Sequence, residues 1–128
     1  MTPFGKRVRE MRAERKISLK TMAHALDVTP AYLSALEHGH RGKPGHNFIQ
    51  RTIAFFNVIW DEAEDLERLA AISHPKVTID TSGIDPLATE LANKLAASIT
   101  DLTPGDLKTL ILELETSLKR NVSPIDRR

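Results

Sequence analysis

Residues 36–46, with the sequence LEHGHRGKPGH, concentrate side chains that could bind a ligand. They contain three of the chain's five histidines, three of its six glycines and two basic residues. Three imidazoles could bind a metal ion, and glycines beside a lysine could cradle a phosphate. The two cations could instead bind a polyanion from outside. Each kind of site requires different neighbouring residues.

The spacing of these residues argues against the first two sites. His38, His40 and His46 follow the pattern H-x-H-x5-H, and Arg41 and Lys43 would repel a cation. A nucleotide-binding loop needs G-x-x-x-x-G-K-[ST] after a strand, whereas these glycines recur every three residues after a helical pattern. We therefore expect no metal site and no nucleotide loop. A clamp on nucleic-acid phosphates remains, with a solvated loop that binds nothing as the alternative.

Charge is distributed unevenly along the chain. Residues 1–57 contain ten Lys and Arg against four Asp and Glu, whereas residues 58–128 contain eight against thirteen. The first part is therefore suited to a polyanion, although the net charge of the whole chain is only +1. Four of the five histidines also lie in the basic part, so the asymmetry grows in mild acid.

The composition excludes several classes of protein. With 128 residues, 41% of them apolar, the chain suits one domain, or a small domain with an appended helical module. No apolar run approaches the roughly 18–20 residues of a membrane span, and no secretory signal pattern opens the chain. The absence of cysteine excludes disulfides and thiol chemistry. Because no nucleophile elbow, H-E-x-x-H or dinucleotide motif occurs, we expect no enzyme, no catalytic residues and no cofactor.

The elements that must position the loop are helices. Apolar residues recur at helical spacing in five segments, at residues 4–16, 19–26, 30–38, 48–56 and 61–72. Ser18 and Thr29 are good N-caps, Gly39 is a left-handed terminator, and Asn47 caps or opens the fourth segment. Trp60 is expected to anchor the core, since a single tryptophan makes a poor stacking platform. Residues 1–73 should form an all-α domain.

The remaining residues differ from this domain in composition. Residues 74–84 are expected to be a linker or to contain one short strand at 76–80, where Val77 and Ile79 alternate with polar residues. Leucines striped at helical spacing predict helices at 86–100 and 104–120, within a two-helix module at 85–120. Residues 121–128 are polar and expected to be a frayed tail.

Two short helices joined by Asp27-Val28-Thr29 have the spacing of a helix-turn-helix. Residues 4–60 resemble the Cro-like, xenobiotic-response-element type of helix-turn-helix regulators. The matching features are Arg12, Ser18, the pair Met22-Ala23, the three-residue turn, and the ending YLSALEHG. The resemblance implies a five-helix, lambda-repressor-like DNA-binding domain.

The resemblance also implies structural roles for several residues. In the family, the acid of the Glu-x-Gly ending pairs with the helix-one arginine, so Glu37 should form an internal salt bridge with Arg12. Ala23 is small where the two helices cross closely. Asp27 occupies a position where the family usually has glycine, and Asp tolerates a left-handed conformation at some cost.

The second helix of the motif, residues 30–38, is expected to enter the major groove of DNA. No arginine or glutamine on it could read a base with two hydrogen bonds, so we expect sparse direct readout supplemented by DNA shape. Leu19 replaces the phosphate-binding glutamine common in the family, which leaves Lys20 as the nearest candidate. The expected DNA contacts are Ser18, Lys20, Thr29, Pro30, Ala31, Tyr32, Ser34, Ala35, His38, His40, Arg41 and Lys43.

One recognition helix reads few base pairs, so specific binding needs a two-fold dimer with half-sites roughly 34 Å apart. The leucine-striped module is expected to form this homodimer. The alternative is that its helices pack back on the DNA-binding domain. The expected dimerisation residues are Leu91, Leu95, Leu107, Leu110, Ile111, Leu114 and Leu118.

These inferences predict a cytoplasmic, nucleoid-associated transcription regulator that binds double-stranded DNA as a homodimer and acts as a repressor. One alternative is an antitoxin, whose acidic C-terminal half binds a toxin enzyme as protein partner while its helix-turn-helix represses its own operon. Another is a helical adaptor that joins proteins and has a vestigial DNA motif. Phosphate contacts make DNA binding steeply dependent on salt, so a flat salt dependence would favour the adaptor.

Overall fold

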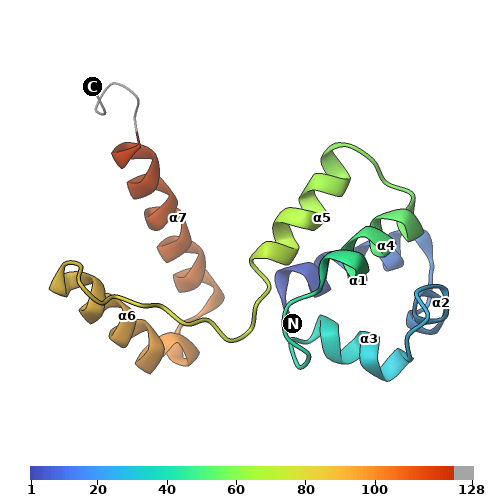
Figure 1. Cartoon of the computed structure of the whole chain (residues 1–128), viewed down its shortest axis with the longest axis horizontal. Coiled ribbons are helices and arrows are strands. Elements are labelled where there is room, and N and C mark those ends of the chain that lie inside the picture. Colours follow the sequence, from blue (N-terminus) through green and yellow to red (C-terminus); the bar gives the residue numbers. More distant parts are fainter. Residues whose placement is uncertain (123–128) are drawn as a thin grey trace. The chain divides into compact units, whose positions relative to one another are not determined.

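The computed structural model describes residues 1–122, and the regular structure in this part of the chain is entirely helical (Figure 1). The all-α class expected from the sequence is confirmed. The elements are α1 (Pro3–Arg15), α2 (Leu19–Ala25), α3 (Pro30–Glu37), α4 (His46–Phe56), α5 (Asp61–Ala71), α6 (Pro86–Ser98), the 3-10 helix η1 (Ile99–Asp101) and α7 (Pro104–Asn121). The chain divides into two compact units, Met1–Thr78 and Ile79–Arg128.

Helices α1 to α5 form the first unit around one apolar core. All five contribute, because each presents apolar side chains at helical spacing. The buried core cluster contains Phe4, Val8, Met11, Met22, Ala23, Leu26, Leu33, Ile49, Phe56, Val58, Leu66 and Ala70.

Side-chain caps begin three helices of the first unit. The hydroxyl oxygens of Thr2, Ser18 and Thr29 each accept a hydrogen bond of 3.0 Å from a backbone N–H in the first turn of α1, α2 and α3. These bonds satisfy helix N–H groups that have no partner within the helix. Helix α4 instead begins at His46 after Gly45, which makes no side-chain cap. The expected start at Asn47 is therefore one residue late.

Trp60 does not lie in the core, so the prediction of a core anchor is wrong. Its side chain is 78% exposed and that of Ile59 is 67% exposed, whereas Val58 is 7% exposed. Asn57 and Trp60 both have positive φ, at 52° and 55°, and Trp60 is the N-cap of α5. The turn between α4 and α5 thus buries Val58 and leaves the following two apolar side chains in solvent.

Residues 76–80 form no strand in the described part of the chain, so the strand alternative for residues 74–84 is wrong. Val77 is 72% exposed and Ile79 is 61% exposed. Alternation of apolar residues stabilises a strand only where a neighbouring strand pairs with its backbone and a core covers one face. Neither is present here.

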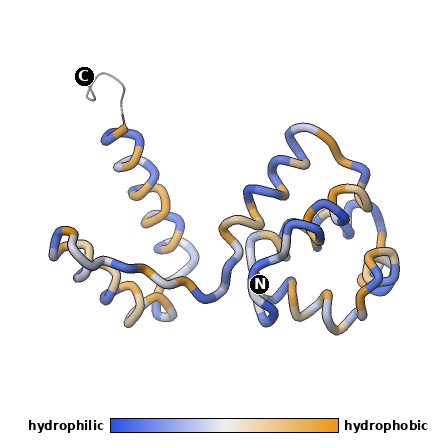
Figure 2. Tube along the Cα trace, in the orientation of Figure 1, coloured by the Kyte–Doolittle hydropathy of each residue, from blue (hydrophilic) through white to orange (hydrophobic). Residues whose placement is uncertain are grey.

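The second unit contains α6, η1 and α7, and none of its described residues, 79–122, is buried. In Figure 2 the trace of α7 alternates between hydrophobic and hydrophilic residues along its length. Its N-terminus has a capping box, in which the N–H of Asp106 donates to the Thr103 hydroxyl and the N–H of Thr103 donates to the Asp106 carboxylate. Hydrogen bonds from the backbone N–H and the side chain of Thr103 to the carboxyl of Asp106 lower its pKa, and the backbone bond has the larger effect.

Helix α7 ends at Asn121, the first residue of the expected frayed tail. Residues 123–128 of that tail lie outside the described residues. Among the helices of residues 1–122, none combines the length and the apolar character needed to cross a membrane.

Candidate nucleic-acid interface

Helices α2 and α3 form a tight helix-turn-helix within the first unit. Met22, Ala23 and Leu33 are at most 1% exposed and pack the two helices together. Ala23 also accepts the backbone N–H of Val28 at 2.9 Å, which closes the turn. Asp27 has φ 57°, the left-handed conformation expected at this position. The turn is therefore built from local bonds and from one side chain small enough for close helix packing.

A buried ion pair holds α3 against α1. The guanidinium of Arg12 binds both carboxylate oxygens of Glu37, and the Nη2 to Oε1 distance is 3.1 Å. Arg12 is 6% exposed and Glu37 is 3% exposed. The predicted salt bridge is thus present in the structure. Because Arg12 is enclosed by α1, α2 and α3, it cannot contact DNA.

Three backbone contacts fix the same corner. The N–H of Thr2 donates to the carbonyl of Glu37 at 3.0 Å, and the N–H of Phe4 donates to the Ser73 hydroxyl at 2.9 Å. A Cβ on Gly5 would lie 2.2 Å from the Glu37 carbonyl oxygen, so only glycine allows α1 and α3 to approach this closely. The C-terminal end of α3 is therefore rigidly connected to α1 and to the end of α5. Sequence patterns contain no signal for bonds between residues so far apart.

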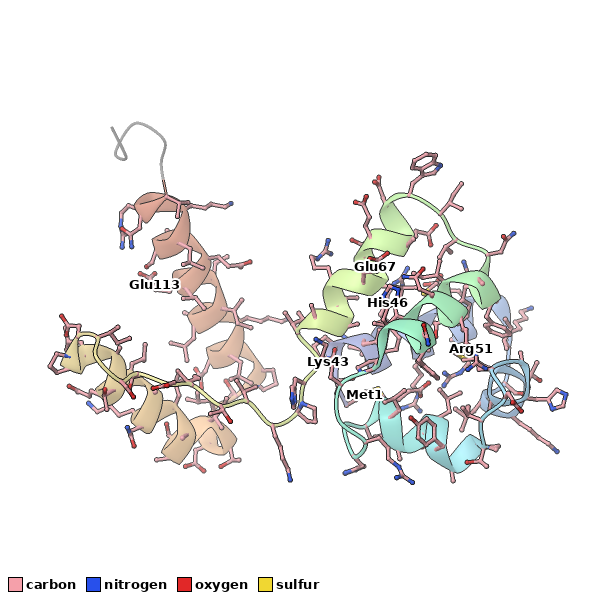
Figure 3. All side chains as sticks on the ribbon, in the orientation of Figure 1. Met1, Lys43, His46, Arg51, Glu67 and Glu113 are labelled. Carbon is pink, nitrogen blue, oxygen red and sulfur yellow. The ribbon has the colours of Figure 1, made fainter. Side chains whose placement is uncertain are left out.

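Arg51 is a further residue that the sequence did not reveal. It lies on α4, and its guanidinium donates to the carbonyl of Leu26 at the end of α2 (Figure 3). This bond satisfies a carbonyl that has no partner within the short helix. Arg51 thus connects α4 to the end of α2, and the residue is exposed.

The residues expected to contact DNA lie at or beside the N-termini of α2 and α3, along α3 and in the loop after α3, and none of them is buried. Most of them are exposed, and Ser34 and Ala35 are half-buried. Tyr32 is the largest side chain on the exposed face of α3 and is 36% exposed. The remaining members of the set are Ser18, Lys20, Thr29, Pro30, Ala31, His38, His40, Arg41 and Lys43.

The loop after α3 folds back on the helix. The Arg41 guanidinium lies over the Tyr32 ring, 5.3 Å from its centroid. The rings of His38 and His40 stack with centroids 6.4 Å apart, and Nδ1 of His38 donates to the Ser34 carbonyl at 2.8 Å. A guanidinium is attracted to an aromatic face, and this attraction holds Arg41 beside α3.

Lys43 has different surroundings from Arg41. It lines a hollow of about 310 Å³ with His46 at the start of α4 and Glu67 on α5, all labelled in Figure 3. The two basic residues of the loop thus have different neighbours: Arg41 lies beside α3, and Lys43 lies beside α4 and α5. His46 also lies in this hollow, whereas His38 and His40 stack on each other at the end of α3. Within residues 1–122, no three His, Asp or Glu side chains lie close enough to hold a metal ion.

Part of the basic surface of α1 is neutralised by neighbouring acids. Arg7 lies 3.3 Å from Glu14 and 3.7 Å from Glu10, and Arg15 lies 3.8 Å from Glu14. Since exposed ion pairs of this kind reduce the local field, α1 offers less positive charge than its composition suggests.

Comparison with known proteins shows what the first unit is similar to. Residues 5–62 match the family model described as a helix-turn-helix domain. The chain is similar to RghRB of Bacillus subtilis (strain 168), described as an uncharacterized HTH-type transcriptional regulator, with 33% identity over 61 residues. The match covers 48% of this chain and 44% of the relative, so the chain spans less than half the length of that protein. No solved structure matches the chain significantly.

The matched residues coincide with α1 to α4 and the turn before α5. Residues 5–62 are therefore similar to a helix-turn-helix domain, a class in which the second helix of the motif lies in the major groove of DNA. The second helix of the motif in this chain is α3.

Proposed function

We propose that this chain is a sequence-specific transcription regulator of the Cro-like type, which binds double-stranded DNA as a homodimer and represses transcription. The observation that carries the proposal is the outer face of α3. It is exposed, its N-terminus is capped by Thr29, and its other face is held rigidly by the pair of Arg12 and Glu37. A helix so presented can enter the major groove without rearrangement.

Base recognition in this proposal depends on few hydrogen bonds. Tyr32 and Ser34 can each make single hydrogen bonds to base edges, and Ala31 and Ala35 can contact thymine methyl groups. The remaining specificity comes from the shape and deformability of the DNA.

Backbone binding depends on the cations around the recognition helix. Lys20 lies at the start of α2 and Arg41 follows α3, and both are exposed. Both can reach phosphates on either side of a helix that lies in the groove. Lys43, beside α4, adds to the positive potential further along the loop.

Homodimerisation is supported by the second unit. Helices α6 and α7 expose seven large apolar side chains and bury none, and exposed apolar surface of this kind marks interaction sites. A dimer would present two copies of α3 to successive turns of the major groove. Repression follows because a bound dimer blocks a promoter without any further contact. The proposal includes no catalytic step.

The proposal is tested by selecting DNA fragments from random sequence, then measuring binding to the selected site by fluorescence anisotropy across a salt series. Six to ten phosphate contacts predict a loss of roughly 10³–10⁵ in affinity from 50 to 200 mM salt. Binding to a scrambled site measures the specificity ratio. An affinity that does not change with salt, or equal affinity for both sites, would refute the proposal and favour a protein adaptor.

Arg68→Ala is a suitable control variant in this assay. It removes one positive charge from α5, whose main contacts are with α1 and α4. Arg68 is 67% exposed and pairs only with Asp65 among the described residues. The variant should therefore bind the selected site with nearly the affinity of the unchanged chain.

A further inference from the structure

Helix α7 has an apolar face that nothing in the described part of the chain covers. Ile111 is 57% exposed, Leu114 is 58% exposed and Leu118 is 54% exposed. Leu107, one turn before Ile111, is half-buried. These four residues follow each other at intervals of four, three and four, which is the spacing of a helix that pairs with another helix along one stripe. The face is therefore built to pack against a helix.

The charges beside this stripe indicate which helix covers it. Lys108 and Glu115 follow stripe residues at equivalent positions, seven residues apart, and so lie on the same edge of α7. Among the described residues, neither forms an ion pair within the chain. Charges at the edges of a helix pair set the orientation of the partners.

Only one orientation of a second copy of α7 brings Lys108 and Glu115 near side chains of opposite charge. In a parallel pair, the edge with Lys108 and Glu115 would face the opposite edge of the partner, where Leu110 and Ser117 lie, so neither charge would meet an opposite charge. In an antiparallel pair, Lys108 of one copy lies opposite Glu115 of the other, and the reverse pair forms by symmetry. A register that places Leu107 level with Leu118, and Ile111 level with Leu114, leaves Lys108 only two residues, about 3 Å along the axis, from the level of Glu115 of the partner, within reach of their side chains.

We propose that α7 pairs antiparallel with α7 of a second copy, about a two-fold axis between residues 112 and 113, with Lys108 opposite Glu115 on both sides. This inference rests on the homodimer in the proposed function and specifies its interface. It makes the dimer symmetric, so that the same residues of both copies form the contact. It also means that the charges of Lys108 and Glu115 determine which copies can pair.

Charge reversal tests this geometry on the full chain without DNA. Lys108→Glu places Glu opposite Glu twice in its own dimer, and Glu115→Lys places Lys opposite Lys twice. Each variant alone should dimerise about tenfold more weakly than the unchanged chain, since two pairs change from attraction to repulsion. An equimolar mixture should form a heterodimer in which both pairs are attractive, with an affinity close to that of the unchanged chain.

Sedimentation equilibrium measures these affinities, and circular dichroism checks that both variants keep their helix content. Glu113→Lys is the matched control, because it makes the same charge change as Glu115→Lys on the face of α7 away from the stripe. It should leave the dimer unchanged. Figure 3 labels Glu113 on this helix.

Two results would overturn the proposal. One is a mixture that dimerises no more tightly than either variant alone, and the other is a loss in the Glu113→Lys control as large as that in Glu115→Lys. Either would refute the antiparallel pairing and leave the DNA-binding proposal in place, because that is decided by anisotropy. An unchanged chain that stays monomeric at every concentration would refute the homodimer itself.

Discussion

The ion pair of Arg12 and Glu37 predicts a large loss of stability when one charge is removed. In Glu37→Gln, the guanidinium of Arg12 stays in a site where the arginine is only 6% exposed, with no carboxylate to balance its charge. Leaving one partner of a buried pair uncompensated costs about 3–5 kcal/mol. Because a small domain has roughly 5–15 kcal/mol of stability, this loss would remove a large share of it and shift the unfolding midpoint clearly.

Urea denaturation followed by circular dichroism measures this loss in the full chain. Glu14→Gln is the matched control, because Glu14 also pairs with an arginine, at 3.3 Å from Arg7, but is 58% exposed. Exposed pairs contribute about 0–1 kcal/mol, so the control should change the free energy of unfolding by less than that. Equal effects of the two substitutions would refute the reasoning, because burial would then make no difference.

A double substitution separates the charge from the packing. Arg12→Met with Glu37→Leu replaces both ions with apolar side chains of similar length. Since apolar replacement of a whole buried pair is often neutral, the double variant should regain most of the stability lost in Glu37→Gln. If it were no more stable than the single variant, the loss would come from shape and not from the uncompensated charge.

Three further predictions concern the loop, the helix crossing and the second unit. Changing Arg41 and Lys43 together to Ala should weaken binding to all DNA sequences alike and lower the salt slope by about 2, and a loss confined to one operator base would mean that the loop reads sequence. Gly5→Ala should destabilise the domain by about 1–3 kcal/mol in urea denaturation, because the added Cβ would lie 2.2 Å from a carbonyl oxygen of α3, and an unchanged midpoint would show that the helices can separate freely. The pKa of Asp106 is lowered by hydrogen bonds from Thr103, so its contribution to α7 is present at neutral pH and is lost as pH falls below about 4, and carboxyl NMR shifts of a Thr103→Ala variant should show a higher pKa.

Local signals allowed much of the first unit to be predicted from the sequence. Ser18 and Thr29 cap their helices as expected, because a capping hydroxyl bonds only to a backbone group three residues away. The left-handed Asp27 was expected from the resemblance, because Asp stands where the family usually has glycine and tolerates this conformation. The pair of Arg12 and Glu37 came from the resemblance to a family and not from any local pattern.

Long-range packing accounts for what the sequence did not reveal. Trp60 is apolar and large, but its burial depends on how α4 turns into α5, which no local pattern specifies. The bond from Phe4 to Ser73 joins residues 69 positions apart, and the contact of Arg41 with Tyr32 depends on the path of a loop. Such contacts exist only once the chain is folded, so residue types and spacing cannot predict them.

The two faces of α3 are held by different physical means, and this difference bears on how the domain would read DNA. Its inner face is fixed by a buried ion pair and by the bond from Thr2 to the Glu37 carbonyl, so its position in a groove is set by the body of the domain. On its outer face Arg41 lies over Tyr32, in a contact that an exposed cation can exchange for a phosphate. Tyr32 would then be free to turn toward a base only when Arg41 has reached the backbone. Binding to phosphate and reading of sequence would thus be coupled through one loop residue.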